Sequence, residues 1–295
     1  EEANVVELGH SDKDVYDDTK FSSVIDVQAP FYWMVIGESA LNAKNFDEAM
    51  GAEEGMEYEE TGFLFAQNNE DFPGFAIYQE GTGKYQFEVD MYYNAEDEEY
   101  PVYTISPAFD NLWTPGNSNG WSHDNSNMLF TSDYVTYTGY AYLNGSFKFS
   151  NAADWNHTNY GTTGTEGELS TNGGAGNLET AEGVYWASVN IPNLTYTLVK
   201  IETIGLIGGF NGWGSSLPMT AQINGPKDLK YVGEVTLKAG EEFKFRANDG
   251  WDINLGGTFA ALEPNGANLS VAEDGTYEVV LDLSNLPYKA TVTKK

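Results

Sequence analysis

The feature that most constrains this fold is an internal repeat of about 90 to 95 residues. YVGEVTLKAGEEFKFRANDGW at 231–251 matches YTGYAYLNGSFKFSNAADW at 137–155, and GTYEVVLDLSNLPYKATV at 275–292 matches GVYWASVNIPNLTYTLV at 183–199. The triplet NGW occurs at 211–213 and again at 119–121. A repeat of this length is a whole domain, so the chain holds at least two copies of one fold.

A third, weaker copy is indicated near the N-terminus. The end of each repeat has a strand–turn–strand pattern. The same pattern occurs in GKYQFEVDMYYNAEDEEYPVYTI at 83–105, but no FKF or NGW precedes it. The segment is therefore a degenerate copy or an unrelated immunoglobulin-like β-domain. The sequence predicts four parts: an acidic N-terminal segment over 1–20 and three β-sandwiches over 21–105, 106–202 and 203–295.

The local pattern is that of β-structure. YEVVLDL, EVTLKAG, FKFRA and YKATVTK alternate apolar with polar residues, as half-buried strands do, and Gly, Asn and Asp punctuate them at short intervals. Only 41–60 could hold a helix, and its glycines keep it short. We expect an all-β chain of tandem immunoglobulin-like β-sandwich modules joined by short linkers near 105–110 and 200–203.

Composition excludes several classes of function. The net charge is −31, which repels phosphate backbones and anionic lipid. The absence of Cys excludes disulfides, thiolate metal sites and a Cys nucleophile. No stretch of about 18 apolar residues occurs. The acidic first twenty residues contain no signal peptide, which leaves export open. Because 41% of residues are hydrophobic and aromatics are abundant, the chain is expected to fold.

The same residue types recur in order in both repeats. They are Trp213, Lys244, Trp251 and Asn268 in the last repeat, and Trp121, Lys148, Trp155 and Asn177 in the middle one. The second Trp follows the Lys by seven residues in each. An indole stacks on the C–H face of a sugar ring, Lys donates to hydroxyl oxygens, and Asn donates and accepts. None of them supplies a nucleophile, so the set suits sugar binding better than catalysis.

Structural alternatives stand beside this interpretation. A Trp in a β-sandwich is more often a core residue, and Lys244 could simply be a solvated strand residue. Asn172 competes with Asn177 for the amide role in the middle repeat. Three further aromatics there have no assigned role: Trp113, Tyr160 and Trp186.

The motifs GGFNGWGSSLPM and FKFRANDGW, with a later Asn, resemble the glycogen- and starch-binding module of AMP-activated kinase β-subunits and starch-branching enzymes. The tandem arrangement is similar to the SusE/SusF-type starch-binding lipoproteins of the Bacteroidetes outer membrane. The resemblance is strong over 203–295, moderate over 106–202 and weak over 21–105. The middle repeat departs from the pattern, with LWTPGNSNGW in place of LIGGFNGW and the insert GTTGTEGELSTNGGAG before Asn177.

The resemblance implies non-catalytic binding of an α-glucan at the cell surface, through those eight residues, without cofactor or metal. It implies that the modules over 106–202 and 203–295 bind carbohydrate and that the module over 21–105 does not. It also implies an outer-membrane glycan-uptake complex as partner, and a lipid anchor on an N-terminal Cys that this chain lacks. The alternatives are a surface protein of the same type for a different polysaccharide, and a structural or adhesive stalk. An enzyme is disfavoured, because the three His form no metal-binding pattern and no G-x-S-x-G is present.

Overall fold

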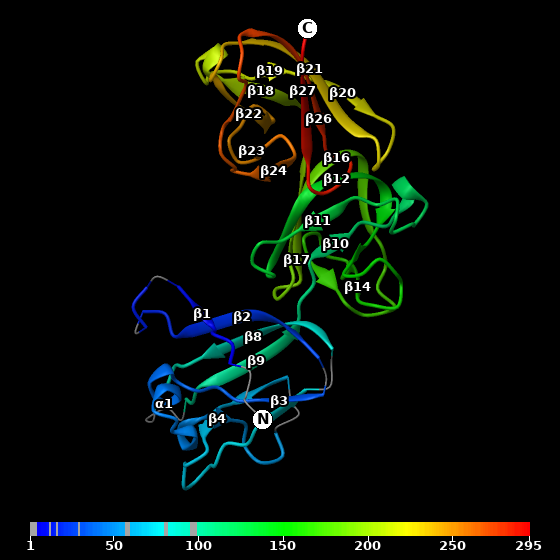
Figure 1. Ribbon diagram of the computed structural model, residues 1–295. Coiled ribbons are helices and arrows are strands. Elements are labelled where there is room, and N and C mark those ends of the chain that lie inside the picture. The colour runs from blue at the N-terminus through cyan, green and yellow to red at the C-terminus, as the bar shows by residue number, and fades with distance from the viewer. Residues whose placement is uncertain are drawn as a thin grey trace. The chain divides into compact units, whose positions relative to one another are not determined.

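The regular secondary structure of the described residues consists almost wholly of antiparallel strands, as Figure 1 shows. The computed structural model describes residues 5–11, 13–15, 17–28, 30–56, 60–79, 82–94 and 99–295. The chain divides into two compact units, Glu1–Phe109 and Asp110–Lys295. The predicted all-β fold is confirmed. No helix in the described ranges is long and apolar enough to cross a membrane.

The first unit has a five-stranded sheet in the order β1-β2-β8-β9-β5, accompanied by the strand pairs β3–β7 and β4–β6. Its elements are β1 (Gly9–His10), β2 (Lys20–Val27), β3 (Phe31–Trp33), α1 (Glu38–Asn42), η1 (Phe46–Glu48), β4 (Met50–Gly51), β5 (Thr61–Phe63), β6 (Phe65–Ala66), β7 (Ile77–Gln79), β8 (Gly83–Asp90) and β9 (Val102–Pro107). Strand β1 comes from the acidic segment 1–20, so that segment contributes to the sheet. Helix α1 begins three residues before the range expected from the sequence.

The core of the first unit lies under one face of its sheet. Phe87 and Val89 of β8 and Tyr103 and Ile105 of β9 are buried, while the residues between them face outward. Trp33 packs edge-on against Phe87 and Tyr103, with ring centroids 5.1 and 5.4 Å away. This alternation leaves the residues at 88, 90, 102 and 104 on the solvent side.

The second unit contains both clear repeats. The middle repeat comprises β10 (Asn111–Trp113), η2 (Asn117–Asn119), β11 (Met128–Phe130), β12 (Thr136–Phe147), β13 (Phe149–Ser150), β14 (Asn159–Thr162), β15 (Leu169–Ser170), β16 (Leu178–Asn190) and β17 (Thr195–Lys200). The last comprises β18 (Ile204–Gly208), η3 (Gly209–Asn211), β19 (Leu217–Pro218), β20 (Thr220–Ile223), β21 (Leu229–Leu237), β22 (Glu242–Ala247), β23 (Asn254–Thr258), β24 (Ala261–Pro264), β25 (Leu269–Ser270), β26 (Gly275–Asp282) and β27 (Lys289–Lys294).

The sheets of the second unit change at the boundary between the repeats. The middle repeat forms the sheet β15-β14-β13-β10-β11-β12-β16-β17. The last repeat forms two sheets, one in the order β19-β18-β22-β23-β24, with β25 also on β22, and one in the order β20-β21-β26-β27.

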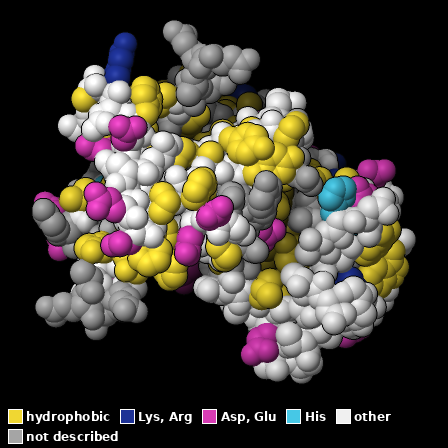
Figure 2. Space-filling model, turned by 90° about the horizontal axis from the view of Figure 1, so that it is seen from below, with side chains coloured by type: hydrophobic (Ala, Val, Ile, Leu, Met, Phe, Trp, Pro, Cys, Tyr) yellow, Lys and Arg dark blue, Asp and Glu magenta, His cyan; other side chains and the backbone are white. Residues whose placement is uncertain are grey.

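Figure 2 shows one face of the molecule, on which hydrophobic and acidic side chains are interspersed and basic ones are few.

The two repeats share one hydrophobic core. Tyr140, Val184 and Ile201 of the middle repeat belong to the same buried cluster as the core of the last. The backbone N–H of Tyr140 donates to the Tyr288 hydroxyl at 2.7 Å, and the rings of these two buried tyrosines are 5.5 Å apart. The Asn127 side chain donates to the carbonyl of Pro226 at 2.8 Å. The repeats are therefore packed together as one body.

This junction predicts that the second unit unfolds cooperatively. Tyr288→Phe leaves the buried N–H of Tyr140 without an acceptor, which we expect to destabilise the unit by about 1–3 kcal/mol. Tyr277→Phe is the matched control, because the Tyr277 hydroxyl bonds to Glu273 within the last repeat only. Calorimetry and hydrogen exchange measure the effect. Tyr288→Phe should lower amide protection in both β12 and β26; loss confined to the last repeat would contradict a shared core.

Candidate functional site

The NGW motif of the last repeat forms a tight turn that fixes Trp213. The Asn211 side-chain oxygen accepts from the Gly208 N–H at 3.0 Å, and the Trp213 N–H donates to the Gly208 carbonyl at 2.9 Å. Gly212 and Trp213 both have left-handed φ values, 63° and 58°. A Cβ at Gly208 would lie 2.8 Å from that of Phe243, so the turn can approach β22 only with glycine there.

The middle repeat builds the same turn from a different sequence. Asn119 accepts from the Gly116 N–H at 2.9 Å, and the Trp121 N–H donates to the Gly116 carbonyl at 2.8 Å. Gly120 and Trp121 both have φ of 64°. The Trp121 indole N–H also donates to the Asn117 side chain at 3.1 Å. The altered sequence around this motif therefore leaves the backbone of the turn unchanged.

Each turn Trp lies beside the second Trp of its repeat. The ring centroids of Trp213 and Trp251 are 6.1 Å apart with the planes at 32°, and those of Trp121 and Trp155 are 6.1 Å apart at 43°. Trp251 is 47% exposed and Trp155 is 46% exposed. The second Trp of each repeat is thus a surface residue in a loop, and each repeat presents a tilted pair of indoles.

The strand lysine of each repeat is largely or partly buried. Lys244 alternates with the buried Phe243 and Phe245 on β22, as the FKF pattern predicts, yet it is only 9% exposed. Burial lowers the pKa of its ammonium group. Within the described ranges, no residue accepts a hydrogen bond from Lys244 Nζ, so the group differs from an ordinary solvated lysine. Lys148 is half-buried, and its Nζ donates to the Ala175 carbonyl at 2.8 Å.

Strand register places the asparagine of the last repeat opposite this lysine. Phe243 on β22 pairs with Leu269 on β25 in the antiparallel ladder. One step further along the ladder, Asn268 lies opposite Lys244. Asn268 is exposed, and its amide nitrogen donates to Glu242 at 2.9 Å. Its side-chain oxygen is left to accept from a ligand.

The middle repeat has the same register, which distinguishes its two candidate asparagines. Phe147 pairs with Leu178, so the next step places Asn177 opposite Lys148. Asn172 lies in the preceding loop, where its side-chain oxygen accepts from the backbone N–H two residues further on at 2.8 Å. Asn177 is therefore the counterpart of the asparagine in the last repeat.

Two of the unassigned aromatics of the middle repeat are structural. Tyr160 is 3% exposed, and burial raises the pKa of its hydroxyl to about 12. Trp186 packs against the shared core, with its ring 4.9 Å from that of Tyr140. Both therefore contribute to packing.

A buried arginine supports the platform of the last repeat, and the sequence analysis did not find it. The Arg246 guanidinium lies 4.9 Å from the centroid of the Trp251 ring, is 4% exposed, and bonds to the Gly214 carbonyl, the Ser216 hydroxyl and Asp249. Hydrogen bonds from Ser216, then from Arg246, lower the pKa of Asp249 to about 2. The cation is thus held over the indole.

The middle repeat supports its platform with a histidine. Ser150 occupies the position of the arginine, and the buried His123 approaches the Trp155 ring edge-on at 4.6 Å. His123 Nε2 lies 3.3 Å from the Ser150 hydroxyl. Burial lowers the pKa of His123, against the opposing effect of Asp154 and Asp124. A neutral imidazole therefore occupies the place of a permanent cation.

A second supporting residue is shared by the repeats. The Asn254 amide donates to the Trp251 carbonyl at 2.8 Å, and the Asn159 amide lies 3.4 Å from the Trp155 carbonyl. Both asparagines begin the strand that follows the Trp loop and stand two residues before a glycine. That recurring Asn-x-Gly is the sequence signal that could have identified them. In the described part of the chain, no three His, Asp or Glu side chains gather as metal ligands would.

The different supports predict different responses to acid. His123 has a folded-state pKa below its ordinary value of 6.5, so the neutral form stabilises the middle repeat. That contribution is complete above about pH 6.5 and is lost as the pH falls through the lowered pKa. The last repeat keeps its Arg246–Asp249 pair ionised down to about pH 2.

Fluorescence difference spectra measure this response. The emission of Trp155, taken as wild type minus Trp155→Phe, should change in a titration with a midpoint below 6.5, and His123→Gln should abolish the change. The emission of Trp251, obtained in the same way, should stay constant over that range. A Trp155 midpoint at or above 6.5 would contradict the burial of His123.

Comparison with known proteins agrees with this architecture. Residues 1–103 match the family model described as SusF, first starch specific CBM, that is, carbohydrate-binding module. The crystal structure of SusF from Bacteroides thetaiotaomicron matches 95% of this chain and 67% of that chain, with a TM-score of 0.50 and 16% sequence identity. No curated protein matches. Residues 1–103 therefore match the family of the first starch-specific module of SusF, and the chain as a whole shares the fold of SusF.

Proposed function

We propose that the second unit binds a neutral α-glucan without catalysis, at one site in each repeat. The observation that carries the proposal is the recurrence in both repeats of a tilted pair of tryptophans, 6.1 Å apart, whose second member is half-exposed. In each repeat the strand lysine also lies opposite an asparagine at matching register. Two copies that differ in surrounding sequence keep these side chains together. Folding alone does not require a half-exposed indole at both places.

The geometry suits successive rings of a curved sugar chain. Two indoles inclined by 32° or 43° offer apolar faces to two neighbouring sugar residues whose own faces are inclined. The little-exposed ammonium of Lys244 can donate to hydroxyl oxygens at low desolvation cost, and the free oxygen of Asn268 can accept from a hydroxyl. A glycan whose successive ring faces lie in one plane fits an inclined pair less well.

The expected affinity is weak at each site. Stacking on one face of a Trp contributes about 2 kcal/mol at ~25 cal/mol per Å², and each hydroxyl hydrogen bond adds about 0.5–1.5 kcal/mol. Association also costs free energy, because the protein and the glycan lose translational and rotational freedom and the glycan chain becomes ordered. With that cost subtracted, the expected Kd is about 0.1–1 mM per site. Two sites that engage one polymer raise the effective affinity by roughly 10²-fold or more.

The comparisons support the same ligand class. The family model that matches the first module is described as starch specific, and the structural relative is SusF. We extend these properties to this chain as part of the proposal. In the same sense we propose a surface location at the outer membrane, a lipid anchor in the full-length protein, and partnership with a glycan-uptake complex.

Migration in native gels that contain amylopectin tests the ligand class. We expect retardation in amylopectin and none in dextran or xylan gels. Retardation by one of those glycans instead would identify the alternative of a different polysaccharide, and no retardation in any gel would favour a structural stalk. A reducing-sugar assay with amylose checks for catalysis, where sustained product release would overturn a binding-only role.

Substitution of the exposed platform residues tests the sites. Trp251→Ala and Trp155→Ala should each weaken maltoheptaose binding at their own site by about 30-fold, which corresponds to the loss of about 2 kcal/mol. Trp251→Phe keeps a ring and should retain more affinity. Val199→Ala, at a residue that is 44% exposed away from the platforms, is the control. Titration calorimetry measures the effect; wild-type affinity in the double Trp variant would refute the assignment.

A further inference from the structure

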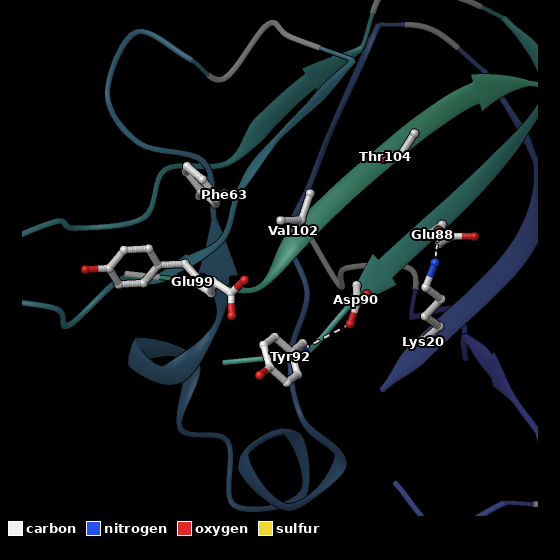
Figure 3. A pocket seen from close by; sticks show the side chains of 9 residues that line it. Lys20, Phe63, Glu88, Asp90, Tyr92, Glu99, Val102 and Thr104 are labelled. Atoms are coloured by element: carbon white, nitrogen blue, oxygen red, sulfur yellow. Dashed lines mark hydrogen bonds and ion pairs between the residues drawn. The ribbon is translucent and has the colours of Figure 1, made fainter. Parts of the chain in front are cut away.

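Cations are scarce in this acidic chain, and several of them lie beside a carboxylate. The sequence has 14 Lys and Arg against 45 Asp and Glu, so acidic partners are plentiful. Figure 3 shows one such pair in the first unit, where Lys20 lies 3.6 Å from Glu88 in a cleft that β2, β5, β8 and β9 form. Lys294 and Lys295 near the end of the chain are paired in the same way. A buried lysine without a partner therefore needs an explanation of its own.

Lys244 is such a lysine. It is 9% exposed, and across the ranges that the structure describes no oxygen accepts a hydrogen bond from its Nζ. Burial lowers the pKa of the ammonium group, because the charged form loses solvation. A buried cation without a partner destabilises the fold, and an apolar side chain of similar length, such as Met, would avoid that cost. Packing alone therefore does not account for a lysine at this position.

The lysine of the middle repeat has the opposite properties. Lys148 is half-buried, and its Nζ donates to the Ala175 carbonyl at 2.8 Å. Ala175 closes a turn over 172–175, in which its own N–H donates to the Asn172 carbonyl at 2.9 Å. A Cβ at Gly161 would lie 3.1 Å from Lys148 Nζ, so the ammonium group lies between β14 and this turn. Lys148 therefore holds the loop of its own repeat.

The loops that carry the two asparagines are attached to the fold in the same way. Each accepts one hydrogen bond from the neighbouring strand: the Thr162 N–H donates to the Gly176 carbonyl at 3.0 Å, and the Gly257 N–H donates to the Ala267 carbonyl at 2.6 Å. By this register, Gly266 is the counterpart of Ala175. Its carbonyl accepts no hydrogen bond from Lys244 in the described structure. The two lysines thus differ in their partners although the backbone around them is alike.

We propose that the two sites of the second unit are unequal: Lys244 donates to the hydroxyl oxygens of a bound glycan, whereas Lys148 positions the turn over 172–175 and the middle site binds without it. The inference rests on the proposed function, and it assigns different roles to residues at equivalent positions. The Lys244 ammonium is already largely removed from water, so a hydrogen bond to the ligand displaces little solvent. The last repeat is then the tighter of the two sites.

The inference predicts opposite effects of one substitution on stability. Lys244→Met removes an unpaired buried charge, so the melting temperature of the second unit should not fall. Lys148→Met leaves the Ala175 carbonyl without its donor, which should lower the melting temperature by about 2–4 °C and speed amide exchange at Ala175. Lys148→Arg keeps a donor and should restore both. Calorimetry and hydrogen exchange measure these effects, and an equal fall in both Met variants would contradict the assignment.

Binding is measured in the full chain with one platform removed, by retardation in gels over a series of amylopectin concentrations. Trp155→Ala leaves only the last site, where Lys244→Met should weaken binding by about tenfold or more. Trp251→Ala leaves only the middle site, where Lys148→Met should change the affinity by less than about threefold. Lys230→Met, at an ion-paired lysine in the other sheet of the last repeat, is the control and should change neither site.

The remaining outcomes separate this inference from the proposed function. If Lys148→Met weakens the middle site as much as Lys244→Met weakens the last, the lysines are equivalent; the inference is then overturned, while retardation of the wild type still upholds the proposed function. Unchanged binding in Lys244→Met overturns the inference as well. If the wild type is not retarded by amylopectin, the proposed function itself fails, and the inference fails with it.

Discussion

The candidate site of the last repeat depends on one constraint, the burial of two alternate phenylalanines on a single strand. Phe243 and Phe245 must both enter the core, which fixes the face and the register of β22. Lys244 is then directed to the other face, and Asn268 is brought opposite it. The close approach of Gly208 to Phe243 forces the turn that carries Trp213. One core requirement thus positions groups that lie 55 residues apart in sequence, from 213 to 268.

The repeats keep the platform and vary its support. Arg246 holds Trp251 in the last repeat through a buried cation, whereas the neutral His123 approaches Trp155 in the middle one. Either a guanidinium or an imidazole can support an indole ring, because the contact needs only a charge or a polar ring edge at about 5 Å from it. The two supports differ in how they respond to pH, since only the imidazole titrates near neutral pH. The repeats can thus differ in response while presenting the same surface.

Periodicity and repetition predicted the fold class, because FKF alternation and NGW turns are local and a duplicated pattern separates shared features from chance. They also selected the candidate site residues, whose role in binding stays a prediction. The supports were missed for a physical reason: Arg246 and His123 meet their tryptophans only through tertiary packing, and they differ between the repeats. The burial of the Lys244 side chain was also not predicted from the sequence, since it depends on the loops that pack around the strand. The cleft of the first unit combines β2, β5, β8 and β9, which no single segment reveals.

The shared core also changes what tandem repetition can achieve. Modules on a string would enhance one another through a linker-dependent effective concentration, which falls as the linker loosens. Here Ile201 and Tyr140 join the core of the last repeat, so the two platforms stand in a fixed relation. Under the proposed function, a polymer whose shape matches that relation would engage both platforms without further ordering of the protein, and one that does not match would gain nothing from the second. Rigidity would therefore convert two weak, individually permissive platforms into a selection on the conformation of the glycan.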